Sequence, residues 1–396
     1  MNKNAKSAAF TTLLASIVTL QLVAFSDRAQ ANENQLSYEV EAGYEFNDNV
    51  RLQTEENEID ISGFKVSVPV NFESTTERFT GEINARAEVS RFDESDYDSD
   101  DQRIEGRTSY KFERGEGSLY ALINRDTTRD SEFLDTGLVG LSASRREAIE
   151  GGGSGDIQLT ETSGLLAEFH LEDVSYEAER FSDFEYGIAD LGWSLQYNSK
   201  LRYQVQLHGS RFESKELLGT VSDGLGFKVG FQSDFTERSS LKILAGWLDV
   251  DSDYDEGNDQ GLTDDSAGTH LVDAQYRYKA ERSDFTATWI SAPLPSGNGF
   301  LRVTDQLNLR YRYSLSEFSR VSFNIIAGRR GIIEERVEAD RDYVRFGIRL
   351  ERRLSESWVL SGRYIYSQQD RERVSGTASA NEVQLSLVFR PAPSVW

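Results

Sequence analysis

The sequence contains no cysteine, five prolines and three histidines, and its one methionine is the first residue. Without cysteine the chain has no disulfide framework. Basic residues are also in deficit, with 43 Lys and Arg against 67 Asp and Glu, which gives a formal net charge of −24 at pH 7. This acidic balance argues against nucleic acid as a partner, because phosphates require a basic surface.

Long apolar runs are absent except at the N-terminus. There Lys3 and Lys6 precede the stretch SAAFTTLLASIVTLQLVAF, and Ala29-Gln30-Ala31 offers a small-x-small cleavage site. We expect residues 1–31 to be a secretory signal peptide cut after Ala31, with an uncleaved membrane anchor as the alternative. Cleavage removes three basic residues and one acidic residue, which changes the net charge from −24 to −26. No later stretch approaches the roughly 18 apolar residues of a spanning helix.

Alternation of apolar and polar residues is what the rest of the chain has in abundance. Residues 301–316 read LRVTDQLNLRYRYSLS, in which every odd position except Asp305 is Leu, Val or Tyr and every even position is polar. Strands of globular proteins last about five or six residues and tilted membrane strands about nine to eleven. Tyrosines near the run ends, such as Tyr311 and Tyr313, resemble aromatic girdles. These features predict an all-β, transmembrane antiparallel β-barrel in preference to a soluble β-sandwich.

Short and long connections also alternate along the chain. The short ones are residues 73–77, 113–117, 197–200, 234–239, 279–283, 314–319 and 353–357, and the longer, more acidic ones are 93–101, 249–265, 292–299 and 334–342. Short periplasmic turns and long outer loops alternate in this way in bacterial barrels. If residues 129–157 form one long loop, the count is eighteen strands, and if they form a hairpin it is nineteen. We predict eighteen, because single-chain bacterial barrels have even numbers.

One barrel domain is therefore expected over residues 32–396. The loop at 129–157 would constrict the pore if it folds inward, or lie at the surface. Residues 391–396 form a C-terminal extension, in which Pro391 and Pro393 are expected to end strand pairing. Either Phe389 or Trp396 could serve as the signal for assembly.

Five stretches carry a resemblance to a known family: YEFNDNVRL (44–52), FTERSSLKILAGW (235–247), SAPLPSGNG (291–299), YSLSEFSRVSF (313–323) and RLSESWVLSGRYIYSQQDRE (353–372). They resemble the β-barrel porin type 2 family of bacterial outer-membrane proteins, several of which are tied to exopolysaccharide export. The resemblance covers nearly the whole mature chain and is weakest at 126–160. It implies location in the outer membrane of a Gram-negative cell, a transport or export role, and no catalytic residues.

The partners expected for such a barrel are outer-membrane lipid and lipopolysaccharide, the barrel-assembly machinery, and periplasmic machinery for polysaccharide synthesis or export.

If the apolar face meets lipid, the polar face lines the lumen. Alternation then assigns ten arginines to the lumen as candidates for setting selectivity: Arg302, Arg310, Arg312, Arg320, Arg330, Arg345, Arg349, Arg353, Arg363 and Arg371. Acidic residues expected to point inward are Glu39, Glu41, Glu45, Glu82, Glu88, Asp173, Glu177 and Glu179.

Several functions fit these faces. An arginine-lined wall would guide anions or uronate-like sugars, because arginine donates bidentate hydrogen bonds to oxyanions. Basic and acidic parts of the wall that face each other would instead make a general pore with an electric field across the lumen. Nearly all aromatic residues fall on the lipid face by register, which disfavours a stacking ladder for neutral sugars. The channel is expected to be monomeric or loosely oligomeric. The alternative is a barrel with a blocked lumen that does not conduct and acts as a scaffold, receptor or adhesin through its acidic loops.

Other motifs give weaker signals. Asp249, Asp251, Asp253 and Asp255 alternate, but Tyr254 and Gln260 occupy the Gly and Glu positions of an EF-hand, so weak divalent binding is the most that we expect there. His170, His208 and His270 are too few and too scattered to indicate a metal site. Ser210, His208 and Glu213 lie close in sequence without a motif for a nucleophile and its base. We predict neither a cofactor nor catalysis, and no nucleotide-binding motif is present.

Overall fold

The structure is a computed structural model that describes residues 33–54, 58–129, 144–215, 219–254, 265–332, 341–371 and 376–396. The expected signal peptide at 1–31 lies outside these residues, as do 255–264 and 333–340. Within the described part of the chain, no helix has the length and apolar character needed to cross a membrane.

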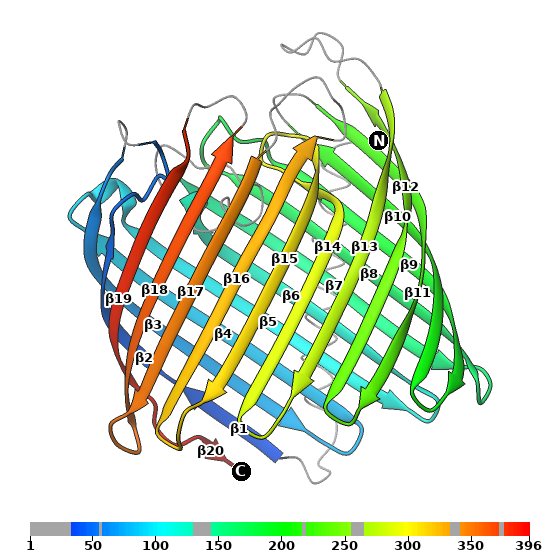
Figure 1. Cartoon of the computed structure of the whole chain (residues 1–396), viewed down its shortest axis with the longest axis horizontal. Helices are drawn as coiled ribbons and strands as arrows, with labels where there is room; N and C mark the ends of the chain where they lie inside the picture. Colours follow the sequence, from blue (N-terminus) through cyan, green and yellow to red (C-terminus); the bar gives the residue numbers. More distant parts are fainter. Residues whose placement is uncertain are drawn as a thin grey trace.

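The chain is almost entirely antiparallel β-structure (Figure 1). The strands are β1 (Glu33–Tyr38), β2 (Val40–Asn47), β3 (Ile61–Thr75), β4 (Phe79–Phe92), β5 (Ser99–Phe112), β6 (Gly115–Thr127), β7 (Arg145–Gln158), β8 (Ser163–Tyr176), β9 (Phe184–Asn198), β10 (Leu201–Ser214), β11 (Val221–Thr236), β12 (Ser239–Asp253), β13 (Asp265–Lys279), β14 (Ser283–Pro295), β15 (Leu301–Ser314), β16 (Ser319–Ile332), β17 (Arg341–Arg353), β18 (Trp358–Arg371), β19 (Ala378–Phe389) and β20 (Ser394–Val395). A short 3₁₀ helix, η2 (Ser95–Tyr97), follows β4.

The sheet closes on itself as a barrel of eighteen strands, which confirms the predicted fold and strand number. Each strand from β3 to β19 pairs with its neighbours in the sequence, and β2 pairs with β19 from Val40↔Phe389 to Asn47↔Glu382. β1 and β2 count as one barrel strand because both pair with β3 in the same register. The ladder is interrupted at Glu39, which faces Pro69, a residue without an amide hydrogen to donate.

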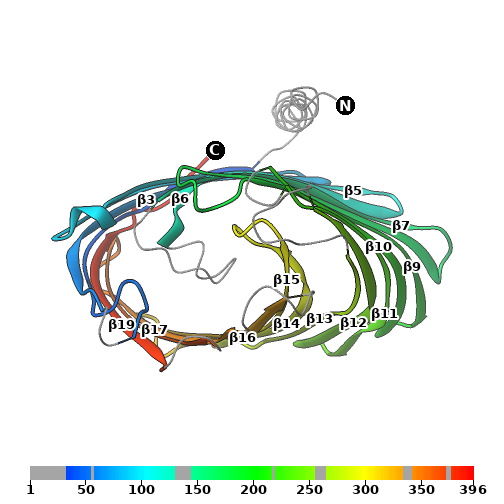
Figure 2. The same cartoon turned by 90° about the horizontal axis from the view of Figure 1, so that it is seen from above.

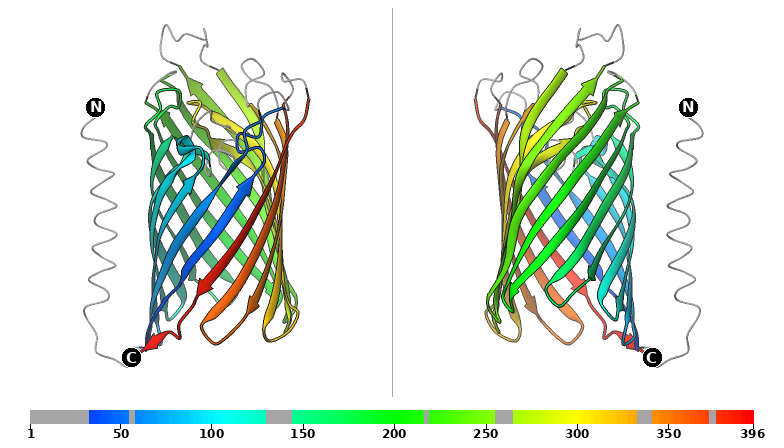
Figure 3. Two further views of the ribbon diagram at one scale, coloured as in Figure 1. Left: turned by 90° about the vertical axis from the view of Figure 1, so that its left-hand side faces the viewer. Right: turned by 90° about the vertical axis from the view of Figure 1, so that its right-hand side faces the viewer.

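The two ends of the barrel differ, as Figure 3 shows. One end carries short connections, such as that between β3 and β4, and we call it the short-turn end. The other carries the longer connections, and we call it the long-loop end. In the short turns, threonine hydroxyls accept hydrogen bonds from backbone amides of the turn. Thr76 Oγ1 accepts from the amides of Arg78 and Phe79, and Thr236 Oγ1 accepts from the amide of Arg238.

The outward face is apolar and the inward face polar, as the alternation predicts. Leu225, Phe64, Leu191 and Leu207 are 72%, 69%, 64% and 64% exposed on the outside. Near the short-turn end, aromatic rings form a row on that face. The Tyr311 ring lies 6.5 Å from Phe285 and 6.3 Å from Phe323. A face of this kind is stable against a lipid bilayer and costly in water.

Residues 129–157 do not form one long loop, so that prediction is wrong. Arg145–Gln158 is strand β7, paired with β6 and β8 along its length. Its glycines make room for large neighbours: a Cβ on Gly152 would lie 2.5 Å from Tyr120 Cε1, and one on Gly153 2.6 Å from Leu119 Cδ2. The remainder of the segment, residues 130–143, lies outside the described part of the chain.

The C-terminal extension interrupts strand pairing at its prolines and then resumes it. Strand β19 ends at Phe389, just before Pro391, and pairing resumes beyond Pro393, where β20 pairs with β1. Asn34 and Trp396 exchange two backbone hydrogen bonds of 3.0 Å, and the Trp396 ring lies 6.3 Å from Phe72. Arg390 Nε and Nη2 donate to the two carboxylate oxygens of Glu39 at 2.6 and 3.0 Å, and these hydrogen bonds raise the pKa of Arg390.

A candidate pore narrowed at the long-loop end

The β14–β15 hairpin bends into the barrel, as the view from above shows (Figure 2). Its tip meets the segment between β8 and β9, where the Ser182 amide donates to the Gly297 carbonyl at 2.7 Å. A Cβ on Gly297 would lie 3.1 Å from both Phe181 and Tyr176, and Gly299 has a φ of 87°. The close approach and the left-handed backbone explain why glycine stands at both positions.

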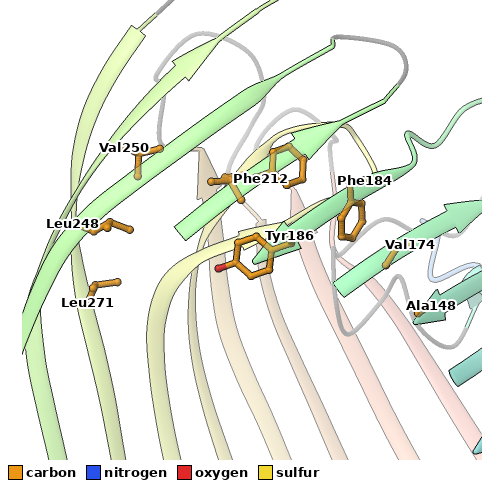
Figure 4. Close-up of a cluster of buried hydrophobic side chains, with 9 residues drawn as sticks. Ala148, Val174, Phe184, Tyr186, Phe212, Leu248, Val250 and Leu271 are labelled. Carbon is orange, nitrogen blue, oxygen red and sulfur yellow. The ribbon is translucent and has the colours of Figure 1, made fainter. Parts of the chain in front are cut away.

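An apolar cluster lies inside the barrel beside this hairpin (Figure 4). Ala148, Val174, Phe184, Tyr186, Phe212, Leu248, Val250, Leu271 and Leu301 make up the cluster. It joins β7–β13 to the first residue of β15, so it fills part of the lumen at the long-loop end. Alternation alone had left these interior aromatic residues unexpected, because it had assigned nearly all aromatics to the lipid face.

A second segment folds inward on the opposite side of the same end. Leu52, with a φ of 45°, packs against Ile326, Tyr343, Ala378 and Ala380 on the inner faces of β16–β19. Its carbonyl accepts a hydrogen bond of 2.6 Å from Gln369 Nε2. Nearby, the amide and hydroxyl of Ser62 donate to Asp93, which holds the pKa of that carboxyl below its usual range.

Most of the described part of the predicted constriction at 129–157 is strand β7, and Arg129 is the one described residue that precedes the gap at 130–143. Thr128 is buried, and Arg129 Nη2 lies 3.7 Å from Glu45 Oε1 on β2. The Arg129 guanidinium also lies 5.0 Å from the centre of the Phe92 ring. Within the described residues, the hairpin and the Leu52 segment are therefore the inward-folded parts of the long-loop end, and sequence reasoning identified neither.

Three of the ten predicted arginines, Arg302, Arg330 and Arg371, gather at this narrowed end together with Arg341, which the sequence analysis did not assign to the lumen. Arg330, Arg341 and Arg371 stand directly opposite one another in register across β16, β17 and β18. Arg302 is on β15, two residues from the register partner of Arg330. Arg302, Arg330 and Arg341 are 6%, 1% and 3% exposed, and the guanidiniums of Arg330 and Arg341 lie 4.9 and 5.4 Å from the Tyr343 ring centre. Like charges placed opposite one another destabilise a sheet, so a row of this kind is costly unless other groups compensate it.

Four other predicted arginines lie in ion pairs on the inner wall. Arg345 and Arg363 both contact Glu382, Arg349 Nη2 lies 3.3 Å from Glu41 Oε1, and Arg320 Nη1 lies 3.9 Å from Glu351 Oε2. Glu45 joins this network through Lys65 at 3.9 Å and Arg363 at 4.0 Å. A cavity of about 540 Å³ opens among these groups, between the walls formed by β2–β7 and β17–β19.

Three further predicted arginines are exposed near the short-turn end: Arg310 and Arg312 on β15, and Arg353, the last residue of β17. None of the three forms an ion pair with a described residue. The ten arginines therefore occupy three settings: a buried row, a wall of ion pairs, and an exposed group.

Acidic residues line the wall formed by the early strands, which lies across the lumen from β14–β17 (Figure 2). Glu41, Glu45, Glu82 and Glu88 lie on the inward face, as predicted, and Glu88 contacts Lys65 at 2.5 Å. Glu39 contacts Arg390 at the seam. Asp173 does not point inward, because its register partner is the outward Ile149, and it contacts Lys215 at 3.4 Å. Glu177 and Glu179 lie beyond the end of β8.

The residues weighed for other chemistry are engaged elsewhere. His208 Nδ1 lies 2.9 Å from Asp190 Oδ1, which Lys228 Nζ also contacts at 2.8 Å, whereas Glu213 lies on the opposite face of β10 from Ser210. His170 contacts Tyr120, and His270 Nε2 lies 3.5 Å from Asp305 Oδ1. Among the described residues, no group of three His, Cys, Asp or Glu could hold a metal ion. Asp255, part of the predicted divalent site, lies outside them.

No protein-family model matches the chain, and no curated protein matches it. Among solved structures it is similar to OccAB3 of Acinetobacter baumannii, with 12% identity, a TM-score of 0.42, and coverage of 91% of this chain and 99% of that one. OpdQ of Pseudomonas aeruginosa and OccK2 (OpdF) of the same organism in complex with glucuronate each show 11% identity and a TM-score of 0.44. Each match covers 91% of this chain and 98% of the other. Likeness at this level does not indicate a substrate, and the resemblance to the β-barrel porin type 2 family stays a prediction.

Proposed function

We propose that this chain is an outer-membrane channel that passes small hydrophilic solutes and prefers those with negative charge. The observation that carries the proposal is the closed eighteen-strand barrel with an apolar outside and a charged inside. A closed barrel leaves no unpaired strand edge in lipid, and its polar interior provides a water-filled path. The short-turn end then faces the periplasm and the long-loop end the exterior.

The preference for anions follows from where the arginines lie. A permeating solute passes the exposed Arg310, Arg312 and Arg353 near the short-turn end, whereas Arg330 and Arg341 at the other end are buried. Rings of Arg or Lys select anions in pores, and guanidinium groups match carboxylate and phosphate geometry. The paired Arg345, Arg349 and Arg363 contribute less, since Glu382 and Glu41 neutralise them.

The finer part of the proposal is passage of an anionic polysaccharide, in association with periplasmic synthesis or export machinery. It is supported by the resemblance to exopolysaccharide-associated barrels and by the basic wall on β15–β18. Lipid, lipopolysaccharide and the barrel-assembly machinery would be the partners of any such barrel. The second candidate, a receptor or scaffold that does not conduct, is favoured by the apolar cluster and the two inward segments that fill the long-loop end.

The test is single-channel recording of residues 32–396, refolded and inserted in planar bilayers under a salt gradient. We expect a stable channel with a reversal potential of anion-selective sign, blocked by acidic oligosaccharides more than by neutral ones. Arg310→Gln with Arg312→Gln should lower the ratio of anion to cation permeability roughly two- to fivefold, which is the range for exposed charges. The ratio should also fall in Arg345→Gln with Arg349→Gln, because Glu382 would lose one of its two arginines and Glu41 would lose Arg349.

Both double variants should assemble normally, since the substitutions keep polar side chains on a polar face. A folded barrel that never conducts would contradict the channel proposal and favour the receptor or scaffold. An open channel without charge preference would contradict the role of the arginines alone. Block by neutral and acidic oligosaccharides alike would contradict the anionic cargo.

A further inference from the structure

Six basic side chains gather at the short-turn mouth, on one side of the barrel. Arg277 and Lys279 stand at the end of β13, Arg282 in the following turn, Arg310 and Arg312 near the end of β15, and Arg353 at the end of β17. All six are exposed, and none forms an ion pair with a described residue. Their charges are therefore available to a ligand in water.

The strand register spaces these cations regularly. Arg277 and Arg310 both face Thr286, and Lys279 and Arg312 both face Asp284. Each pair is thus separated by two strand spacings, or about 10 Å, and Arg310 and Arg312 lie about 7 Å apart along β15. Asp284 and the turn residues Glu281 and Glu317 are the acidic neighbours. A monovalent anion can contact one or two of these cations, whereas a chain with charges at similar spacing can contact several.

A pocket of about 350 Å³ at the edge of this group adds oxyanion-binding chemistry. Its lining includes Arg282, Arg353, Ser314, Ser316 and Ser319. Arg320 and Arg390 also line it, and their carboxylate partners are Glu351 and Glu39. Guanidinium and hydroxyl donors together suit carboxylate, sulfate or phosphate groups.

The opposite wall of the same mouth carries charges of both signs, because Glu82 faces Arg107 and Glu116 faces Lys111 in register. Glu73, Glu82 and Glu116 lie near the short-turn ends of β3, β4 and β6, and the walls face each other across the lumen (Figure 2). Hydrogen bonds hold two of them in place: Asn71 Nδ2 donates to Glu82 at 2.8 Å and Thr75 Oγ1 to Glu73 at 3.1 Å. This wall therefore offers an anionic chain less uncompensated positive charge than β13–β17 does.

We propose that the short-turn mouth binds flexible polyanions, meaning chains that carry several carboxylates or phosphates, along β13–β17. The site would bind its ligand from the short-turn side, which is the periplasmic side in the proposed function. Affinity arises from many weak contacts made together, so it should rise steeply with the number of charges on the ligand and fall with salt. The use of the site in transport rests on the proposed function, but the binding itself does not.

The experiment measures fluorescence anisotropy of labelled short poly-L-glutamate with the refolded protein in a neutral detergent. We expect saturable binding that weakens with salt and is not competed by free glutamate at the same carboxylate concentration. Arg310→Gln with Arg312→Gln should weaken binding about tenfold, and Arg310→Lys with Arg312→Lys should retain most of the binding, because in exposed contacts the positive charge matters more than the bidentate geometry of the guanidinium. The matched control is Arg125→Gln with Arg211→Gln, two exposed arginines on the outward face.

Equal binding by the lumen double variant and the outward control would overturn the proposal. Equal competition by free glutamate would do so as well, since it would remove the requirement for a chain. If the Gln variant fails to fold, poly-L-glutamate is added to one side of the bilayer at a time and block of the channel current is recorded. Block from the long-loop side alone contradicts the site. A barrel that binds the chain but never conducts would refute the channel and leave this site standing.

Discussion

At the scale of residues, alternation identifies the face on which a side chain lies but not its partners. All ten arginines were assigned to the inward face from the sequence, yet only the structure separates the buried row from the ion-paired wall and the exposed group. The partners come from strands far away in sequence: Arg349 contacts Glu41, and Arg363 contacts Glu45. Register between the last strands and the first therefore decides which charge is free to act on a solute.

Glycines in β7 give a prediction at the same scale. Gly152→Ala should destabilise the barrel by about 1–3 kcal/mol, because the added methyl meets the Tyr120 ring at 2.5 Å and the Phe169 carbonyl at 2.7 Å. Gly155→Ala is the matched control in the same strand, since nothing lies within 4 Å of its added Cβ. Urea unfolding followed by tryptophan fluorescence would measure both. Equal unfolding midpoints would show that β7 tolerates side chains at Gly152.

At the scale of elements, two segments misled the sequence analysis for opposite reasons. Residues 145–158 contain four glycines in five positions, and glycine is depleted in strands, so the stretch was assigned to a loop. Large neighbours such as Tyr120 on β6 compensate for the missing side chains. Residues 292–299 were assigned to an outer loop, although β14 continues to Pro295 and the turn folds inward. The strands with strict alternation were predictable, whereas inward folding depends on contacts between distant segments.

The β14–β15 hairpin carries a prediction about the pore. Deleting residues 297–299 leaves Ser296 and Phe300 as a two-residue turn, removes the contact between the Gly297 carbonyl and Ser182, and withdraws the tip from the β8–β9 segment. We expect a larger single-channel conductance with barrel assembly intact, because the strands themselves keep their pairing from Pro295↔Leu301 onward. Alanine at Glu237 and Arg238, in a short turn at the other end, provides the control. Unchanged conductance in the deletion would mean that the narrowest part lies elsewhere.

At the scale of the whole molecule, the pairing of the first and last strands that closes the barrel was the feature least predictable from the sequence. The two-faced wall follows from period, and the predicted strand number is right although its premise of a loop at 129–157 is wrong, but the seam depends on one proline and on the tail. Pro69 interrupts the first strand at Glu39, and β20 then extends the seam beyond β19 by pairing with β1. The seam joins residues about as far apart in sequence as the chain allows, as in Val40↔Phe389. Such contacts carry the largest loop-closure entropy, so they form late in folding.

This placement predicts a specific effect of shortening the tail. Removing residues 394–396 deletes the two hydrogen bonds between Asn34 and Trp396 and the contact of Trp396 with Phe72, a loss of about 2–4 kcal/mol. Arg390→Gln should cost less, because the Arg390–Glu39 pair is more than one-third exposed on the arginine side and screened by water. Heat-dependent gel mobility of the folded barrel and its refolding rate would measure the two effects. Since the seam closes late, the truncated chain should refold more slowly and melt earlier, and a truncation that changes neither would show that β2 and β19 close the barrel unaided.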